Sequence, residues 1–393
     1  MSRTPRCWLC CLVSSAVLLT LMGLLQADDR PTHDDYLVYI GTYTRGSDSQ
    51  GIYRMRLDAA TGEMTDLQLA GKSENPSFLA IRPDRSALYA VSEIEQLEGR
   101  PTGGLAAFTI DQKNGNLSPL NVQPTGGTGP CYVTTDTSGS VALVANYGGG
   151  SVASFRIARD GSLQSAASMI QHAGSSLNPR RQEGPHAHSI VLSPDGSRAY
   201  APDLGLDQIR IYRVDAEAGT LTPNEAPYAA VAPGAGPRHF DFHPSGRFAY
   251  VINELASTIT AFSHDAGTGA LTELQTVSSL PNGDVPGNST ADIHVHPNGR
   301  FLYGSNRGHN SIAVFAIDPE TGMLTHVQHQ STLGEIPRNF GIDPTGRILL
   351  AENQQSGTIY SFRIDPETGE LTETGHKIEV PRPVCIRFAA WPL

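Results

Sequence analysis

Ionisable side chains stand at both ends of the stretch 236–254, GPRHFDFHPSGRFAYVINE: Arg238 and His239 follow its start, and Glu254 closes it. The alternation of apolar and polar residues predicts a strand, a proline-containing turn and a second strand. Because a β-hairpin folds the chain back on itself, its two ends lie together. The stretch therefore predicts an arginine, a histidine and a carboxylate side by side, a set that can bind an anion and move a proton.

The same hairpin recurs along the chain. Six complete copies stand at 75–93, 129–147, 186–203, 236–254, 290–307 and 336–353. A seventh copy is split, with its second strand at 36–44 and its first strand at 382–390. A glycine turn between two further strands recurs equally often, at Gly62, Gly115, Gly161, Gly219, Gly269, Gly322 and Gly369. The two landmarks together predict seven units of four short strands.

These units predict an all-β fold, a seven-bladed β-propeller with four antiparallel strands in each blade. The split copy predicts that the C-terminal strand joins the N-terminal blade and closes the ring. We therefore expect residues 36–393 to form a single domain, although the length alone would suggest two or three. The irregular segment 168–183 is expected to be a surface loop.

One face of such a propeller should carry the chemistry. The start of each first strand and the end of each second strand open on that face, close to the central channel. Scaffold residues should recur with the repeat, whereas site residues should break it. His188, Arg238, Glu254 and Arg307 break the repeat at these positions, and we expect them to be catalytic.

Further residues of the same face are expected to contact a substrate. They are His186, Asn146, Asn306 and Arg338. Asn146 and Asn306 share their repeat position with Asn253 and Asn353, and this recurrence favours a structural hydrogen bond for the asparagines. His239 is expected to support the site rather than to act in it.

Three segments carry a family resemblance: GPHAHSIVLSPDG at 184–196, the hairpin at 236–254, and YGSNRGHNSIAVFAID at 303–318. With the blade repeat, they resemble the seven-bladed lactonase family, which includes propeller-type 6-phosphogluconolactonases and carboxymuconate-lactonizing enzymes. The resemblance covers residues 36–390. It implies hydrolysis of a sugar-type lactone, as by a 6-phosphogluconolactonase. It also implies a site of one histidine, two arginines and one glutamate, which match His188, Arg238, Arg307 and Glu254.

Lactone hydrolysis needs an activated water and a stabilised oxyanion. Glu254 or His188 is expected to be the general base, and Arg238 to orient the base or to stabilise the developing charge. Arg307 is expected to hold a substrate carboxylate or phosphate. Two other functions could use the same face: a cycloisomerase acting on a muconate-like diacid, and a non-catalytic exported propeller that binds a sugar or a protein.

Metal chemistry is the main alternative to this arrangement. His186 and His188 point to one face of a strand, and with Asp203 or Glu183 they could bind zinc. The spacing alone is a weak signal, so we expect no metal and no other cofactor.

Composition limits the partners. The net charge of −11 and the isoelectric point near 5.6 argue against nucleic acid, because phosphate backbones need a basic surface. A few converging arginines can still hold a small anionic lactone. We expect a monomer.

The N-terminus indicates export. Residues 1–27 have a basic start, an apolar run and a small residue at Ala27, the pattern of a signal peptide, and 28–35 form a short linker. We expect a periplasmic or secreted protein, with an uncleaved membrane anchor as the alternative, and no membrane contact of the mature chain. Cys131 and Cys385 remain after the signal and are expected to be two buried thiols.

Overall fold

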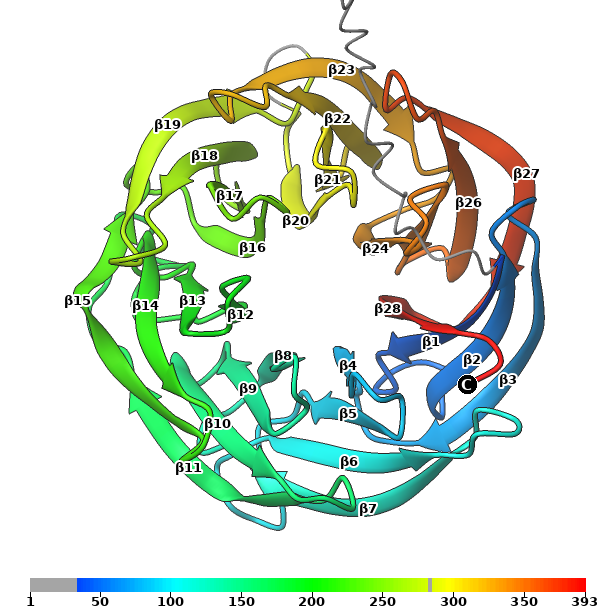
Figure 1. The fold of residues 1–393 in the computed structure, drawn as a ribbon, viewed down its shortest axis with the longest axis horizontal. Helices are drawn as coiled ribbons and strands as arrows, with labels where there is room; N and C mark the ends of the chain where they lie inside the picture. Colours follow the sequence, from blue (N-terminus) through cyan, green and yellow to red (C-terminus); the bar gives the residue numbers. More distant parts are fainter. Residues whose placement is uncertain (1–33, 282–284) are drawn as a thin grey trace, which may run out of the picture. The chain divides into compact units, whose positions relative to one another are not determined.

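The computed structural model describes residues 34–281 and 285–393, and the regular elements of these residues are β-strands. They form seven four-stranded antiparallel sheets arranged in a ring (Figure 1). The expected signal peptide, and the linker up to residue 33, lie outside the described residues. Within the described part of the chain, no helix has the length and apolar character needed to cross a membrane.

Each blade uses four strands in the order innermost, second, third, outermost. The innermost strands are β28 (Pro383–Ala390), β4 (Leu79–Ile81), β8 (Pro130–Thr135), β12 (Val191–Leu192), β16 (Pro237–Phe242), β20 (Ser289–Val295) and β24 (Pro337–Ile342). The second strands are β1 (Asp35–Thr42), β5 (Ala87–Ser92), β9 (Val141–Asn146), β13 (Arg198–Asp203), β17 (Phe248–Asn253), β21 (Phe301–Arg307) and β25 (Ile348–Asn353).

Blade one is the sheet β28-β1-β2-β3, and blades two to seven follow along the chain. The third and outermost strands follow this order of blades. The third strands are β2 (Gly51–Asp58), β6 (Gly104–Ile110), β10 (Ser151–Ile157), β14 (Gln208–Asp215), β18 (Thr258–His264), β22 (Ser311–Ile317) and β26 (Thr358–Ile364). The outermost strands are β3 (Met64–Lys72), β7 (Leu117–Pro124), β11 (Leu163–Gln171), β15 (Thr220–Ala230), β19 (Leu271–Ser278), β23 (Leu324–Ser331) and β27 (Leu371–Glu379).

The ring closes as the split repeat predicts. Strand β28 from the end of the chain pairs antiparallel with β1 from its beginning, and Cys385 lies opposite Gly41. The closing blade therefore holds both ends of the repeat in one sheet, and the predicted seven-bladed propeller is confirmed. Cys131 and Cys385 are both buried and free, as expected.

The hydrophobic core lies between adjacent blades. Strands alternate their side chains between two faces, so each sheet presents apolar residues to both neighbours. For example, Tyr250 and Ile252 of blade five pack in one cluster with Ile293, Leu302 and Phe315 of blade six. The blades therefore fix one another's position, and the inner strand ends are held rigidly around the channel.

The glycine turns take part in these contacts between blades. All seven have positive φ, which favours glycine because a Cβ is strained there. Tyrosines of second strands donate hydrogen bonds to carbonyls of these turns in the next blade, as Tyr250 does to Gly322 at 3.0 Å. The turn landmark of the sequence therefore also locks neighbouring blades together.

A β-bulge recurs near the start of several innermost strands. In blade five the register of β16 against β17 shifts between Pro237 and His239, and blade seven shows the same shift between Pro337 and Asn339. A bulge inserts one residue and re-aims the side chains beside it. Consecutive residues such as Arg238 and His239 can therefore both contact residues of the channel.

Candidate active site

One end of the channel is hollowed into a cavity of about 350 Å³, a size suited to a small molecule. Most of the residues around it belong to inner strands or to the ends of these strands in several blades. The cavity is lined by Tyr43, Glu93, Cys131, Tyr147, Arg181, His188, Glu254, Ser289, Arg307 and Arg338. Of the four residues expected to be catalytic, His188, Glu254 and Arg307 line it directly, and Arg238 lies immediately behind Glu254.

Glu254 is held by three arginines. Its Oε2 lies 3.0 Å from Arg238 Nε and 2.9 Å from Arg307 Nη2, and its Oε1 lies 2.5 Å from Arg181 Nη2. Burial alone would raise the pKa of the carboxyl group, but the three guanidinium groups outweigh burial and lower it to about 2. Glu254 is therefore an ionised, fully paired carboxylate and a poor acceptor for a proton.

Arg238 and Arg307 each bind Glu254 and a backbone carbonyl. Arg238 is 1% exposed, and its Nη1 donates to the carbonyl of Ala291. Burial, together with the neighbouring Arg338 and Arg307, lowers the pKa of Arg238 to about 9. Arg307 donates to the carbonyl of Thr290 at 2.6 Å in addition to its contact with Glu254. Neither guanidinium has its full charge available for a ligand.

Arg338 behaves differently. It lines the cavity with its guanidinium 5.4 Å from the centre of the Tyr43 ring. Its side chain forms no hydrogen bond or ion pair with any residue in the described part of the chain. Burial lowers its pKa, but the nearby Tyr43, Glu93 and Glu254 outweigh this effect and keep the pKa above its usual value. Arg338 is therefore a stable cation with free donors.

The imidazole of His188 lines the cavity as a neutral group. Burial, followed by the charge of Arg238, holds its pKa well below the usual value. Its Nδ1 lies 3.6 Å from the Cys131 sulfur, and its ring centre lies 5.2 Å from that of Tyr147. A neutral imidazole can accept a proton at neutral pH, although nothing in these contacts orients it with a carboxylate.

Two of the expected substrate contacts have a different role. Asn146 and Asn306 are fully buried and do not line the cavity. The side-chain amide of Asn146 donates to the carbonyl of Thr125, and that of Asn306 donates to the carbonyl of Ser279. Both carbonyls follow the outermost strand of the preceding blade. The asparagines therefore tie the connection between blades, so the expectation that they contact the substrate is corrected by this geometry.

His186 also remains outside the cavity lining. Its ring stacks on Tyr147 with centres 4.6 Å apart, and its Nδ1 lies 3.0 Å from the Tyr147 carbonyl oxygen. It can therefore support a tyrosine that does line the cavity. The zinc alternative is not favoured either, because Asp203 Oδ2 lies 2.6 Å from His172 Nδ1. No cluster of three or more metal-ligating side chains occurs in residues 34–281 and 285–393.

Arg181 is the main residue that the sequence did not indicate. It belongs to the segment expected to be a surface loop, of which residues 168–171 extend strand β11 instead. The loop is anchored by the buried Gln182, which donates to the carbonyl of Leu204 and to Asp207. This anchor carries Arg181 to Glu254, where it also contacts the Tyr147 hydroxyl at 3.2 Å.

The other lining residues could have been found from the repeat. Tyr43, Glu93, Cys131 and Tyr147 occupy strand starts or ends of the same kind as Arg238 and Glu254. Tyr43 donates its hydroxyl hydrogen to Glu93, with 2.9 and 3.0 Å to the two carboxylate oxygens. Four arginines and two glutamates thus surround or underlie the cavity, which leaves its charge positive in a protein of net charge −11. Such a site attracts an anion.

Comparison with known proteins places this chain in a family. Residues 37–388 match the family model described as lactonase, seven-bladed β-propeller. A 6-phosphogluconolactonase of Bacillus subtilis is 40% identical over 353 residues, which cover 90% of this chain and 98% of the relative. A 6-phosphogluconolactonase of Formosa agariphila is 35% identical over 309 residues, 78% of this chain and 86% of the relative. The solved structure of a periplasmic gluconolactonase of Pseudomonas aeruginosa is 35% identical, with a TM-score of 0.85 over 91% of this chain and 99% of that chain.

Proposed function

The chain belongs to the family of seven-bladed β-propeller lactonases, and we propose that it hydrolyses a sugar-type lactone bearing an anionic group. The observation that carries this proposal is Arg338, a cation with free donors in a cavity whose other arginines are engaged with Glu254. Lactones that carry a phosphate or carboxylate are the ligands that such a guanidinium binds with two hydrogen bonds.

The remaining arginines fit the reaction itself. Attack of water on the lactone carbonyl transfers negative charge to the carbonyl oxygen, and cationic donors fixed in advance stabilise that charge. Arg181 and Arg307 line the cavity and are held in place by Glu254. In this proposal Glu254 is the anchor that fixes both guanidinium groups, and one of the two neutral imidazoles, His188 or His239, accepts the proton of the water.

Substrate binding should also make that imidazole a better base. The positive charges of Arg238 and Arg338 contribute to the low pKa of both imidazoles at the site, His188 and His239. An anion bound at Arg338 offsets part of this charge, so the pKa of a nearby imidazole rises when the substrate is present. A base whose pKa is nearer to neutrality is more effective in proton transfer.

A lactone panel followed by pH-stat tests the proposal. We expect the wild type to hydrolyse 6-phosphoglucono-δ-lactone with a kcat/KM at least about tenfold above that for glucono-δ-lactone, since charge-assisted hydrogen bonds contribute about 1.5–3 kcal/mol. Glu254→Gln should lower kcat about 100-fold or more, because the oxyanion donors lose their anchor. Rates are corrected for spontaneous hydrolysis.

The matched control is Glu379→Gln, an exposed carboxylate of the outermost strand β27, which should keep wild-type rates. The panel also includes a muconate-type diacid and its lactone. If the wild type accelerates none of these reactions above the spontaneous rate, an enzymatic function is contradicted. Interconversion of the diacid and its lactone, with no hydrolysis of sugar lactones, would instead favour a cycloisomerase.

We also propose that the protein is exported. The apolar segment within residues 1–27 supports this, as does the similarity to a relative described as periplasmic. Cell fractionation of the native host, with N-terminal sequencing of the recovered protein, tests it. We expect a mature chain that begins close to residue 28 in the exported fraction, whereas recovery of the full chain from the cytosol would contradict the proposal.

A further inference from the structure

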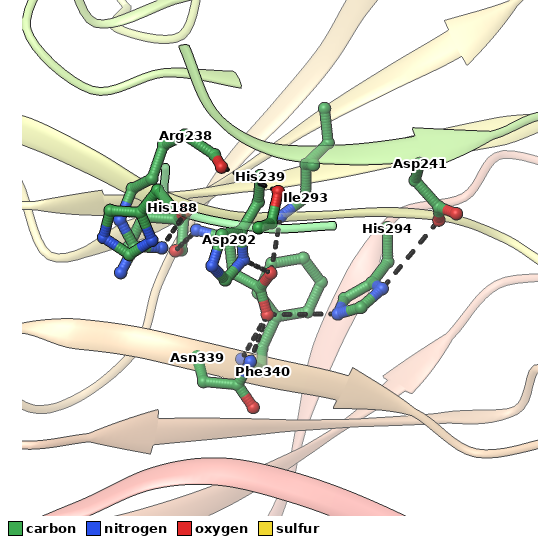
Figure 2. A network of polar contacts seen from close by, with 12 residues as sticks. His188, Arg238, His239, Asp241, Asp292, Ile293, His294, Asn339 and Phe340 are labelled. Carbon is green, nitrogen blue, oxygen red and sulfur yellow. Dashed lines mark hydrogen bonds and ion pairs between the residues drawn. The ribbon is translucent and has the colours of Figure 1, made fainter. Parts of the chain in front are cut away.

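A layer of inner-strand residues adjoins the residues that line the cavity. It joins His239 of β16, Asp292 of β20 and Asn339 of β24, as Figure 2 shows. The His239 ring centre lies 5.3 Å from that of His188, which lines the cavity, and 5.3 Å from that of Tyr132. His239 is not itself a lining residue, and the layer reaches the cavity through its contact with His188.

Asp292 is the centre of this layer. It is 2% exposed and accepts hydrogen bonds on both oxygens. Oδ1 lies 2.6 Å from His239 Nδ1 and accepts from the Ile293 amide, and Oδ2 lies 3.0 Å from His294 Nε2 and accepts from the Asn339 amide. Burial would raise the pKa of Asp292, but the charge of His294 and the hydrogen bond from His239 outweigh burial and hold it well below the usual value. Asp292 is thus a fixed carboxylate.

This contact sets the tautomer of His239. Burial, followed by the charge of Arg238, lowers the pKa of His239 to about 3, so the ring is neutral at physiological pH. A neutral ring bonded to a carboxylate through Nδ1 carries its hydrogen on Nδ1 and a lone pair on Nε2. Nε2 has no hydrogen-bond partner in the described part of the chain and is not among its fully enclosed polar atoms. Because the side chain is 5% exposed, Nε2 is the ring nitrogen left free to contact a water molecule.

His188 lacks this support. Its Nδ1 faces the sulfur of Cys131 at 3.6 Å, and no carboxylate of the described residues lies within ion-pair distance of its ring. Enzymes that use imidazole as a base commonly orient it with a buried carboxylate, which also stabilises the imidazolium that forms. Of the two imidazoles at the site, only His239 has that partner.

We propose that His239, oriented by Asp292 and in contact with His188 of the cavity lining, accepts the proton of the hydrolytic water. This inference rests on the proposed function and names a further residue for the same reaction. The water oxygen bonds to the lactone carbonyl carbon while one of its protons moves to His239 Nε2. The carbonyl electron pair moves to its oxygen beside the arginines. When the carbon–oxygen bond of the ring breaks, the proton moves from Nε2 to the leaving ring oxygen, and the product is a hydroxy acid.

A purely structural role for the layer is the alternative, since Asp292 also ties three successive blades together. Chemical rescue separates the two roles. His239→Ala removes the base and leaves a space that free imidazole can enter, and a general base typically contributes 10²- to 10⁴-fold. We expect the kcat of the variant to fall at least about 100-fold with little change in KM. Added imidazole should then raise the kcat of the variant at least about tenfold.

Three variants complete the experiment. Asp292→Asn preserves size but removes the charge, so kcat should fall by a similar factor without imidazole rescue. His239→Gln serves in place of the alanine variant if that variant does not fold, and its kcat should fall equally. His243→Ala, in the turn of the same hairpin and away from the cavity, is the control and should keep wild-type kcat with or without imidazole.

The outcomes separate this inference from the proposed function. If the wild type hydrolyses lactones but the His239 variants keep its kcat, the inference is overturned and the function stands. The same holds if a folded His239→Ala loses activity that imidazole does not restore, or if imidazole rescues His188→Ala instead. If the wild type hydrolyses no lactone, the proposed function itself fails.

Discussion

Arg238 and Arg338 occupy the same place in two copies of the repeat, in blades five and seven. Each follows the proline that begins an innermost strand, beside the same register shift. Yet Arg238 is 1% exposed and bound to Glu254, whereas Arg338 lines the cavity without an ion pair in the described residues. The repeat thus fixes where an arginine stands, and something outside the strand decides what it does.

The deciding residue follows the second strand. Glu254 and Gln354 hold equivalent backbone positions, since the amide of each donates to the carbonyl that precedes the innermost strand, at Gly236 and Ile336. In blade five, the carboxylate of Glu254 at this position forms an ion pair with Arg238 of the same blade. In blade seven, the neutral side chain of Gln354 forms no ion pair, and the donors of Arg338 remain free of partners within the described residues. One difference in charge therefore separates an arginine held in an ion pair from an arginine with free donors.

The largest expected effect is on stability, in Arg238→Gln. Breaking a buried ion pair typically costs 3–5 kcal/mol, and because Glu254 keeps two other arginines we expect about 3 kcal/mol. Urea unfolding at pH 7 measures it. Arg338→Gln is the matched variant in blade seven and should unfold within about 0.5 kcal/mol of the wild type. Equal losses in the two variants would show that the arginines have equivalent roles after all.

The second expected effect is on substrate binding, in Arg338→Gln. Loss of a charge-assisted contact of about 2 kcal/mol should raise KM for 6-phosphoglucono-δ-lactone roughly thirtyfold. The constants for glucono-δ-lactone should change little, because that substrate has no anionic group to lose. Initial rates with both lactones give the comparison. A similar rise of KM for both would mean that Arg338 contacts the sugar ring instead of the anion.

The sequence alone indicated where the site residues lie in the repeat, but not which side chains pair with one another. Seven glycine turns and the split hairpin determine the propeller and its closure, because a tight turn and a strand pattern are local properties. The same repeat identified His188, Glu254, Arg307 and Arg338, and the structure brings these four to one cavity. Which arginine pairs with Glu254 depends on side chains from different blades, and no local pattern encodes that.

Arg181 and Asp292 show two further limits. Arg181 reaches the site from a loop outside the repeat, so a periodic pattern could not assign it a position. Asp292 does stand on an innermost strand, but its role depends on His239 of the preceding blade and Asn339 of the following one. The recurring asparagines show the opposite case: their recurrence correctly indicated structural hydrogen bonds, and Asn146 and Asn306 belong to the scaffold for that reason.

The smallest expected effect is the most direct test of the comparison, and it comes from Gln354→Glu. This change gives blade seven the carboxylate of blade five, close to a cation that has no ion-pair partner among the described residues. The new carboxylate should pair with Arg338 and compete with the substrate anion, at a loss of about 1.4 kcal/mol, or tenfold in kcat/KM for the phosphorylated lactone.

The loss should appear in KM and should leave glucono-δ-lactone unaffected, because only the anionic substrate competes for Arg338. Gln355→Glu adds the same charge at the next, exposed residue and is the control, with an expected change below about twofold since exposed charges interact weakly through water. If both variants lower kcat/KM equally, the effect is one of general charge, and the residue after the second strand does not decide the role of the arginine. If only Gln354→Glu does so, a single carboxylate accounts for the difference between the two blades.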